Sequence, residues 1–172
     1  MDTIEAILTR RSIRSFRDEP VSQDLIETLL RAAMAAPSAG NEQPWHFIAV
    51  QDRTVLDAIP TVHPYAQMAA EAPLVILVCG DTTLEKHKGF WVQDCTAAVQ
   101  NILLAAHASG LGGVWCGVHP SEERVTAVRE LLSIPAHVVP LALLVIGHPN
   151  EEKPPSDRFD ESRIHRDCWT QP

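Results

Sequence analysis

Residues 91–118 decide the fold, and they read WVQDCTAAVQNILLAAHASGLGGVWCGV. The first part, Trp91–Ser109, is apolar around most of its circumference and carries only a thin polar stripe, so it predicts the longest helix of the chain. Gly110 suits the residue that follows a helix C-terminus, and Gly113–Val118 predicts a strand. Because one sheet in so small a chain cannot cover every face of this helix, we expect it to lie against a second subunit.

The glycines between this helix and this strand do not form a dinucleotide-binding fingerprint. That fingerprint follows a strand and opens a helix, whereas Gly110, Gly112 and Gly113 follow a helix and open a strand. They are interpreted as turn and close-approach residues. The chain also contains no G-x-x-x-x-G-K-[ST] phosphate loop and no G-x-S-x-G nucleophile elbow, which argues against hydrolysis by that route.

Shorter patterned segments flank this unit on both sides. Apolar residues at helical spacing predict helices over residues 2–9, 22–36, 53–59 and 121–132. Apolar runs predict strands over residues 46–50, 74–79 and 138–146. Pro140 inside the last run indicates an edge position or a bulge. Helices and strands do not alternate strictly, so the pattern favours layered α+β architecture.

Composition is that of a single globular domain spanning residues 1–172. Hydrophobic residues make up 45 % of the chain, which excludes disorder, and the net charge of −8 argues against a nucleic-acid partner. No signal segment is recognisable and no apolar run is long enough to cross a bilayer, so we expect a cytoplasmic protein with no membrane contact. The cysteines form no C-x-x-C pair, and the histidines lack metal-ligand spacing, so no metal site is predicted.

Arginine is concentrated near the N-terminus of this acidic chain. Arg10, Arg11, Ser12 and Arg14 follow the first predicted helix, and three cations beside a hydroxyl are suited to a phosphate. The alternative is a solvated helix end whose cations face the negative end of the helix dipole. The loop Pro37–Pro44 supplies amide and hydroxyl groups suited to a polar heterocycle, although an ordinary turn would have a similar composition.

Four stretches together resemble the nitroreductase family of flavin-dependent oxidoreductases, as a short-form member. They are Arg10–Arg14, Ala36–Phe47, the segment from Gln93 to Gly117, and Ile146–Pro149 followed by Arg158. The resemblance implies a three-layer α-β-α sandwich around a central mixed, mostly antiparallel sheet. It also implies an intertwined homodimer that holds two FMN molecules at the subunit interface, with the tail of residues 149–172 wrapped around the partner.

The resemblance assigns the cofactor-binding residues in three groups. The phosphate, ribityl chain and pyrimidine edge would be held by Arg10, Arg11, Ser12, Arg14 and, from the tail, Arg158. The flavin ring would be lined from the other subunit by Pro37, Ser38, Ala39, Asn41 and Gln43. The isoalloxazine would lie beside Trp115, Cys116 and Gly117, with the backbone N–H of Gly117 near N5.

Two features depart from the longer family members. The segment that covers the ring in those members is reduced here to about residues 63–70, where Tyr65 and Gln67 are the candidates for a contact to the pyrimidine edge. Ser156 stands where a basic companion of Arg158 is expected.

The implied activity is ping-pong electron transfer. NADH or NADPH, as a transient donor, gives a hydride to flavin N5 and leaves, and a nitroaromatic, a quinone or a similar acceptor is then reduced at the same face. No protein side chain is expected to be catalytic, because the flavin carries the chemistry. Cys116 is interpreted as inert packing rather than as a redox thiol. One alternative is a flavin-handling protein, dehydrogenase or dehalogenase without general NAD(P)H turnover, and another is a dimeric binding module without flavin.

Overall fold

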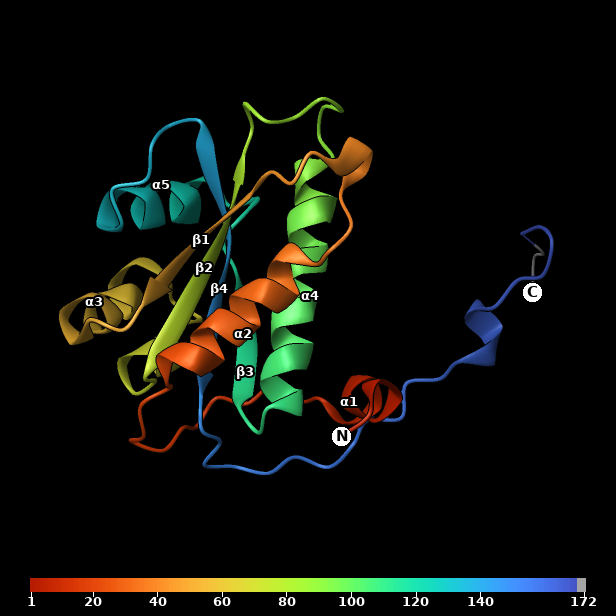
Figure 1. The fold of residues 1–172 in the computed structure, drawn as a ribbon, viewed down its shortest axis with the longest axis horizontal. Helices are drawn as coiled ribbons and strands as arrows, with labels where there is room; N and C mark the ends of the chain where they lie inside the picture. The colour runs from red at the N-terminus through yellow and green to blue at the C-terminus, as the bar shows by residue number, and fades with distance from the viewer. Residues whose placement is uncertain (170–172) are drawn as a thin grey trace.

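The computed structural model describes residues 1–169 and has a four-stranded sheet at its centre (Figure 1). The strands are β1 (Trp45–Val50), β2 (Leu74–Asp81), β3 (Gly112–Gly117) and β4 (Val138–Gly147), in the order β1-β2-β4-β3. The three strand pairs are all antiparallel. The expected mixed sheet is therefore wrong, and parallel pairing in the described residues is confined to the isolated bridge between Ser12 and Gly113.

Pro140 lies in a central strand, so the expectation of an edge position is wrong and that of a bulge is right. β4 has β2 on one side and β3 on the other. Ala142 pairs with Val78, but the next residue of β2, Cys79, pairs with Pro140. This bulge provides the irregular position at which a residue without an N–H can be placed inside a sheet.

Helices cover both faces of the sheet, which confirms the three-layer α-β-α arrangement. One face packs against α2 (Gln23–Met34) and α4 (Trp91–Ala108), and the other against α3 (Arg53–Val62) and α5 (Glu122–Leu131). Alternate residues of β2 enter the two cores: Leu74, Ile76 and Val78 face α2 and α4, whereas Val75 and Leu77 face the other side. This alternation explains why β2 reads as a continuous apolar run.

The turn after α4 positions the N-terminal segment against β3. Gly110 has φ +79°, the left-handed conformation expected for the residue that ends this helix. Gly112 lies so close to the N-terminal segment that a Cβ there would be 2.7 Å from a methyl carbon of Ile13. The Ile13 N–H also donates to the Gly113 carbonyl (3.1 Å). The residues after α1 (Thr3–Thr9) are thereby fixed along the free edge of the sheet.

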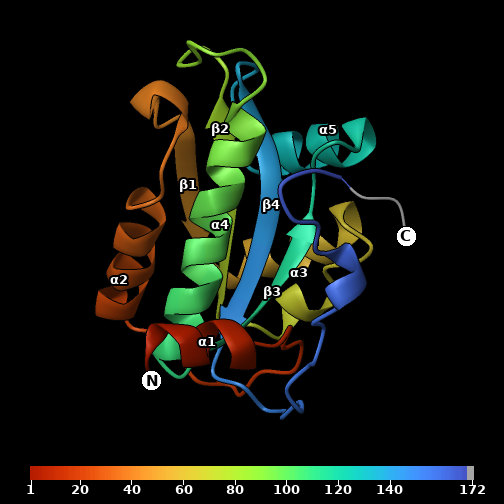
Figure 2. The same cartoon turned by 90° about the vertical axis from the view of Figure 1, so that its right-hand side faces the viewer.

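The C-terminal tail leaves the sheet at β4, passes under the N-terminal segment and then extends away from the body of the protein (Figures 1 and 2). It carries the short helix η3 (Glu161–Arg163). Large apolar side chains remain exposed on it, with Phe159 at 77 % and Trp169 at 81 %. Within residues 1–169, no helix combines the length and the apolar character needed to cross a membrane.

Candidate cofactor site

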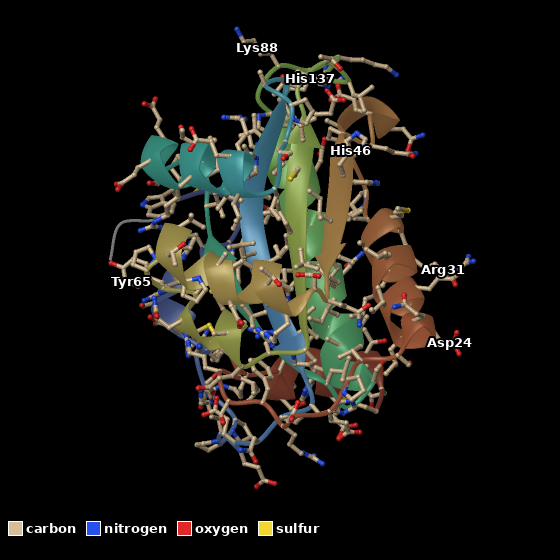
Figure 3. All side chains as sticks on the ribbon, turned by 90° about the vertical axis from the view of Figure 1, so that its left-hand side faces the viewer. Asp24, Arg31, His46, Tyr65, Lys88 and His137 are labelled. Atoms are coloured by element: carbon tan, nitrogen blue, oxygen red, sulfur yellow. The ribbon has the colours of Figure 1, made fainter. Side chains whose placement is uncertain are left out.

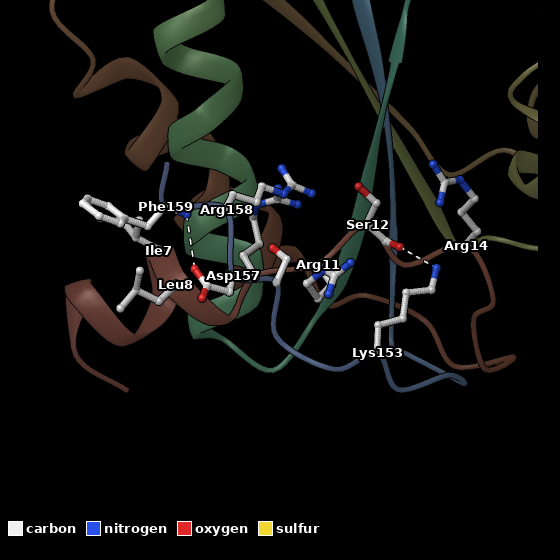
Figure 4. Close-up of a pocket in the computed structure, with 11 residues that line it drawn as sticks. Ile7, Leu8, Arg11, Ser12, Arg14, Lys153, Asp157, Arg158 and Phe159 are labelled. Carbon is white, nitrogen blue, oxygen red and sulfur yellow. Dashed lines mark hydrogen bonds between the residues drawn. The ribbon is translucent and has the colours of Figure 1, made fainter. Parts of the chain in front are cut away.

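The arginine-rich segment and the tail enclose a common cavity of about 510 Å³ (Figure 4). The cavity brings together the predicted phosphate-site residues from the two ends of the chain, which are Arg10, Arg11, Ser12, Arg14 and Arg158. Its wall is completed by Ile7, Leu8, Lys153, Ser156, Asp157 and Phe159. Figure 4 shows Arg11, Asp157 and Arg158 on one side of Ser12 and Arg14 on the other.

Positive charge is in excess in this cavity. Burial lowers the pKa of Arg10, and the charges of Arg158 and Arg11 lower it further. Within the described residues, none of the four arginines of the cavity forms an ion pair with a carboxylate, although Asp157 contributes to the wall. Arg11 donates a hydrogen bond to the Pro154 carbonyl. Cations held close together without acidic partners are suited to bind an anion such as a phosphoryl group.

Two tail residues, Glu151 and Lys153, hold the backbone of the arginine segment in place, and the sequence did not predict their role. Glu151 Oε1 accepts the backbone N–H groups of Arg14 (2.5 Å) and Ser15 (3.3 Å). Lys153 Nζ donates to the Ser12 carbonyl (2.7 Å) and lies 3.1 Å from Glu151 Oε1. Their mixed-charge, proline-rich segment has no periodicity from which these contacts could be predicted.

The strand β3 leads from this cavity along the free edge of the sheet. Trp115 is 37 % exposed, and the Cys116 side chain is buried on the α3–α5 side. A Cβ on Gly117 would meet no atom within 4 Å, so the strand ends beside open space. Burial raises the pKa of the Cys116 thiol, against a smaller opposing influence of the Arg14 charge. A buried thiol with a raised pKa stays protonated near neutral pH and is a poor nucleophile, which supports inert packing for Cys116.

The carbonyl of Gly117 is contacted by two side chains, one at the C-terminus of α3 and one in α5. His63 Nε2 lies 2.9 Å from this oxygen, and a guanidinium nitrogen of Arg124 donates to it at 3.1 Å. The Arg124 guanidinium also lies 5.0 Å from the centre of the Tyr65 ring, which is found at the margin of the α3–α5 face (Figure 3). Sequence reasoning missed His63 and Arg124, because only the folded layers bring them to Gly117. Gln67 instead donates to the Pro60 and Pro64 carbonyls.

The predicted ring-lining loop is not brought to this cavity within one chain. It lies at the N-terminal end of α4, whereas the arginine segment lies near the other end of that helix (Figures 1 and 2). The loop is internally braced. Ser38 Oγ accepts the Gln43 N–H (3.0 Å), the Gln43 amide donates to Asn41 Oδ1 (2.9 Å), and the Ala39 N–H donates to Asp94 Oδ1 (3.0 Å). Pro37 precedes this turn.

Comparison with known proteins supports the resemblance seen in the sequence. The nitroreductase family model matches residues 7–61 and 60–148. The chain belongs to the nitroreductase family. A relative from Methanothermobacter thermautotrophicus, named "Putative NADH dehydrogenase/NAD(P)H nitroreductase", is 54 % identical over 169 residues, which cover 98 % of this chain and 88 % of the relative.

Solved structures of nitroreductase relatives have the same fold. A Parabacteroides distasonis protein with the same name as the relative above has a TM-score of 0.93 at 42 % identity, covering 97 % of this chain and 98 % of that one. A nitroreductase-like protein of Desulfovibrio desulfuricans, solved in complex with FMN, has a TM-score of 0.85 at 32 % identity and covers 99 % of both chains. Family membership therefore applies to nearly the whole chain.

Proposed function

We propose that this nitroreductase is an FMN-dependent oxidoreductase that passes electrons from NADH or NADPH to nitroaromatic, quinone or similar small acceptors. The observation that carries the proposal is the cavity whose four arginines form no ion pair within residues 1–169, at the start of an edge strand whose other end is open. When bound, FMN supplies the hydride chemistry. The chain's own residues bind it, orient it and limit its contact with water.

The cavity residues fit the phosphate end of FMN. Arg10, Arg11 and Arg158 offer guanidinium donors, and Ser12 adds a hydroxyl. Burial is the main cause of the lowered pKa of Arg10, and the charges of Arg158 and Arg11 add to it; a phosphate dianion would offset this repulsive part. Charge-assisted hydrogen bonds of this kind are roughly twice as strong as neutral ones.

The strand residues fit the ring end. Ser12 lies beside Gly113, and Gly117 is four residues further, which corresponds to about 13 Å along a strand. The flavin ring would therefore lie along Trp115, Cys116 and Gly117, with Arg14 at its pyrimidine edge. Because Arg124 and His63 hold the Gly117 carbonyl, the adjoining backbone is fixed before the ring binds.

A homodimer would complete the site. The braced loop containing Pro37, Ser38, Ala39, Asn41 and Gln43 lies far from the cavity of its own chain and is available to line the ring in the partner. The tail exposes Phe159 and Trp169, which a partner surface would cover. We therefore propose that each flavin lies between two subunits and that the tail from residue 149 to residue 169 wraps around the partner; the last three residues of the predicted tail, 170–172, lie outside the described part of the chain.

The absorbance spectrum of the purified protein tests this function. We expect bound flavin that is bleached by NADH or NADPH under argon and recovers its colour when menadione or nitrofurazone is added. A colourless protein that cannot be reconstituted with FMN would refute flavin binding. A coloured protein that neither nucleotide bleaches would instead indicate a flavin-handling protein or a more specialised flavin enzyme.

A further inference from the structure

The tail contributes two cations to the cavity. The resemblance assigns Arg158 to the phosphate, but it assigns no role to the other, Lys153. Lys153 lines the same cavity as the four arginines, and its side chain is 28 % exposed. Ser156, which stands where a basic companion of Arg158 is expected, also lines this cavity. Compared with the longer family members, the tail therefore lacks a positive charge at Ser156 and has one three residues earlier, at Lys153.

The contacts of Lys153 leave it able to bind a further group. An ammonium has three N–H donors. One is used by the Ser12 carbonyl at 2.7 Å, and a second faces Glu151 Oε1 at 3.1 Å. No third partner of Lys153 is found among residues 1–169.

Glu151 fixes the position of this ammonium relative to the arginine segment. Its Oε1 atom receives the N–H groups of Arg14 and Ser15 as well as the Lys153 ammonium. Glu151 and Lys153 therefore contact both ends of the backbone segment from Ser12 to Ser15 as well as each other. The Glu151 carboxylate orients this segment and partly neutralises the charge of Lys153. A site whose binding groups are held by their neighbours loses less entropy when the ligand binds.

We propose that Lys153 binds the phosphate of FMN directly, in place of the basic residue missing at Ser156, and that Glu151 is its positioning residue. This inference rests on the proposed FMN function. It adds a contact from the tail that depends on charge and that acts at the phosphate end of the cofactor.

The test compares FMN with riboflavin, which has the same ring but no phosphate. Binding of each to apoprotein is measured by flavin fluorescence for the wild type, Lys153→Met and Lys153→Arg. One lost charge-assisted hydrogen bond corresponds to about 10-fold to 100-fold weaker binding. We expect Lys153→Met to weaken FMN binding by this factor and to leave riboflavin binding unchanged, whereas Lys153→Arg retains most of the FMN affinity. Lys88→Met, which removes an exposed lysine outside the cavity, is the charge-matched control.

Inorganic phosphate provides a second probe that needs no flavin ring. We expect phosphate to raise the unfolding temperature of the wild-type and Lys88→Met apoproteins, and to raise that of Lys153→Met by less. Glu151→Gln should weaken FMN binding and accelerate hydrogen exchange at the Arg14 and Ser15 amides. Glu152→Gln, which alters the exposed neighbour, should do neither.

The outcomes separate this inference from the function on which it rests. Unchanged FMN affinity in Lys153→Met, or an equal loss for FMN and riboflavin, would overturn the role of Lys153 while leaving the FMN function intact. An equal phosphate response in Lys153→Met and the wild type would also overturn it. A wild-type protein that binds neither flavin would refute the proposed function, and this inference with it.

Discussion

Replacing either of two β3 glycines by alanine should weaken FMN binding, but only one of the two substitutions should destabilise the fold. An alanine Cβ at Gly112 would lie 2.7 Å from Ile13 Cγ2 and 2.8 Å from Ile13 Cβ, whereas at Gly117 it would meet nothing within 4 Å. Since carbon atoms pack at about 3.5–4.0 Å, Gly112→Ala must move the N-terminal segment and β3 apart by about 1 Å. Gly117→Ala requires no such movement in the apoprotein.

The expected magnitudes follow from this geometry. Overpacking costs about 1–3 kcal/mol, so Gly112→Ala should lower the apoprotein unfolding temperature by about 2–4 °C per kcal/mol. It should also weaken FMN binding, because the Ile13–Gly113 hydrogen bond that holds the arginine segment would be strained. Gly117→Ala should change the free energy of unfolding by no more than about 0.5 kcal/mol. It should nevertheless weaken FMN binding at least about tenfold, or about 1.4 kcal/mol, because its methyl group would occupy space assigned to the ring.

Urea denaturation of the apoproteins and flavin fluorescence titration measure these two effects separately. If Gly117→Ala binds FMN as tightly as the wild type, the ring does not lie against Gly117. If Gly112→Ala is as stable as the wild type, the close approach of Ile13 does not hold the arginine segment in place.

Three further expectations concern single side chains. Arg14→Ala should weaken FMN retention about 10-fold to 100-fold and slow turnover, and unchanged flavin content and rate would remove Arg14 from the site. The thiols of Cys79, Cys95 and Cys116 should react only slowly with Ellman's reagent at about pH 8 in the apoprotein, because all three are buried and burial raises the pKa of Cys79 to about 12; rapid labelling that persists in Cys168→Ser would contradict this. The hydrogen bond from the Arg14 N–H lowers the pKa of Glu151 below its usual 4.5, so ionised Glu151 stabilises the fold above pH 4.5 and this stabilisation is lost as the pH falls through the lowered pKa. The difference in unfolding free energy between wild type and Glu151→Gln should therefore shrink below about pH 4.5. A difference that stays constant with pH would contradict this role of Glu151.

The sequence predicted the elements well where local periodicity and packing agree. The long helix is confirmed as Trp91–Ala108, and the start of α2 is set by Ser22, whose hydroxyl accepts the Leu25 N–H. Pro140 shows the limit of local reasoning. A proline indicates an irregular ladder, but strand order depends on pairings distant in the sequence, so the bulge was predictable and the central position was not.

The candidate site was predictable as a set of motifs but not as a network of contacts. The gathering of Arg158 with Arg10 followed from a resemblance, since nothing in the local sequence relates residues so far apart. The contacts of Lys153 were missed because the tail has no periodic pattern and takes its conformation from the surface beneath it. Arg124 was missed for a related reason: it lies on a mostly polar helix with one buried residue, Val128, and its contact with Gly117 depends on how that helix packs.

The net charge of −8 describes the whole chain and conceals the local charge of this cavity. Four arginines and a lysine line it, and the pKa of Arg10 is lowered first by burial and then by the charges of Arg158 and Arg11. Like charges held this close together repel one another in the apoprotein. Glu151 offsets part of this repulsion, but its carboxylate is turned to the backbone of Arg14 and Ser15 and to Lys153, and it forms no ion pair with the arginines. Binding of an anion is more favourable in a cavity whose cations repel one another than in a neutral pocket. The anion reduces this repulsion in addition to forming its own contacts. If the cavity holds the phosphate as proposed, it should therefore favour FMN over an uncharged flavin for an electrostatic reason that is already present in the unliganded fold.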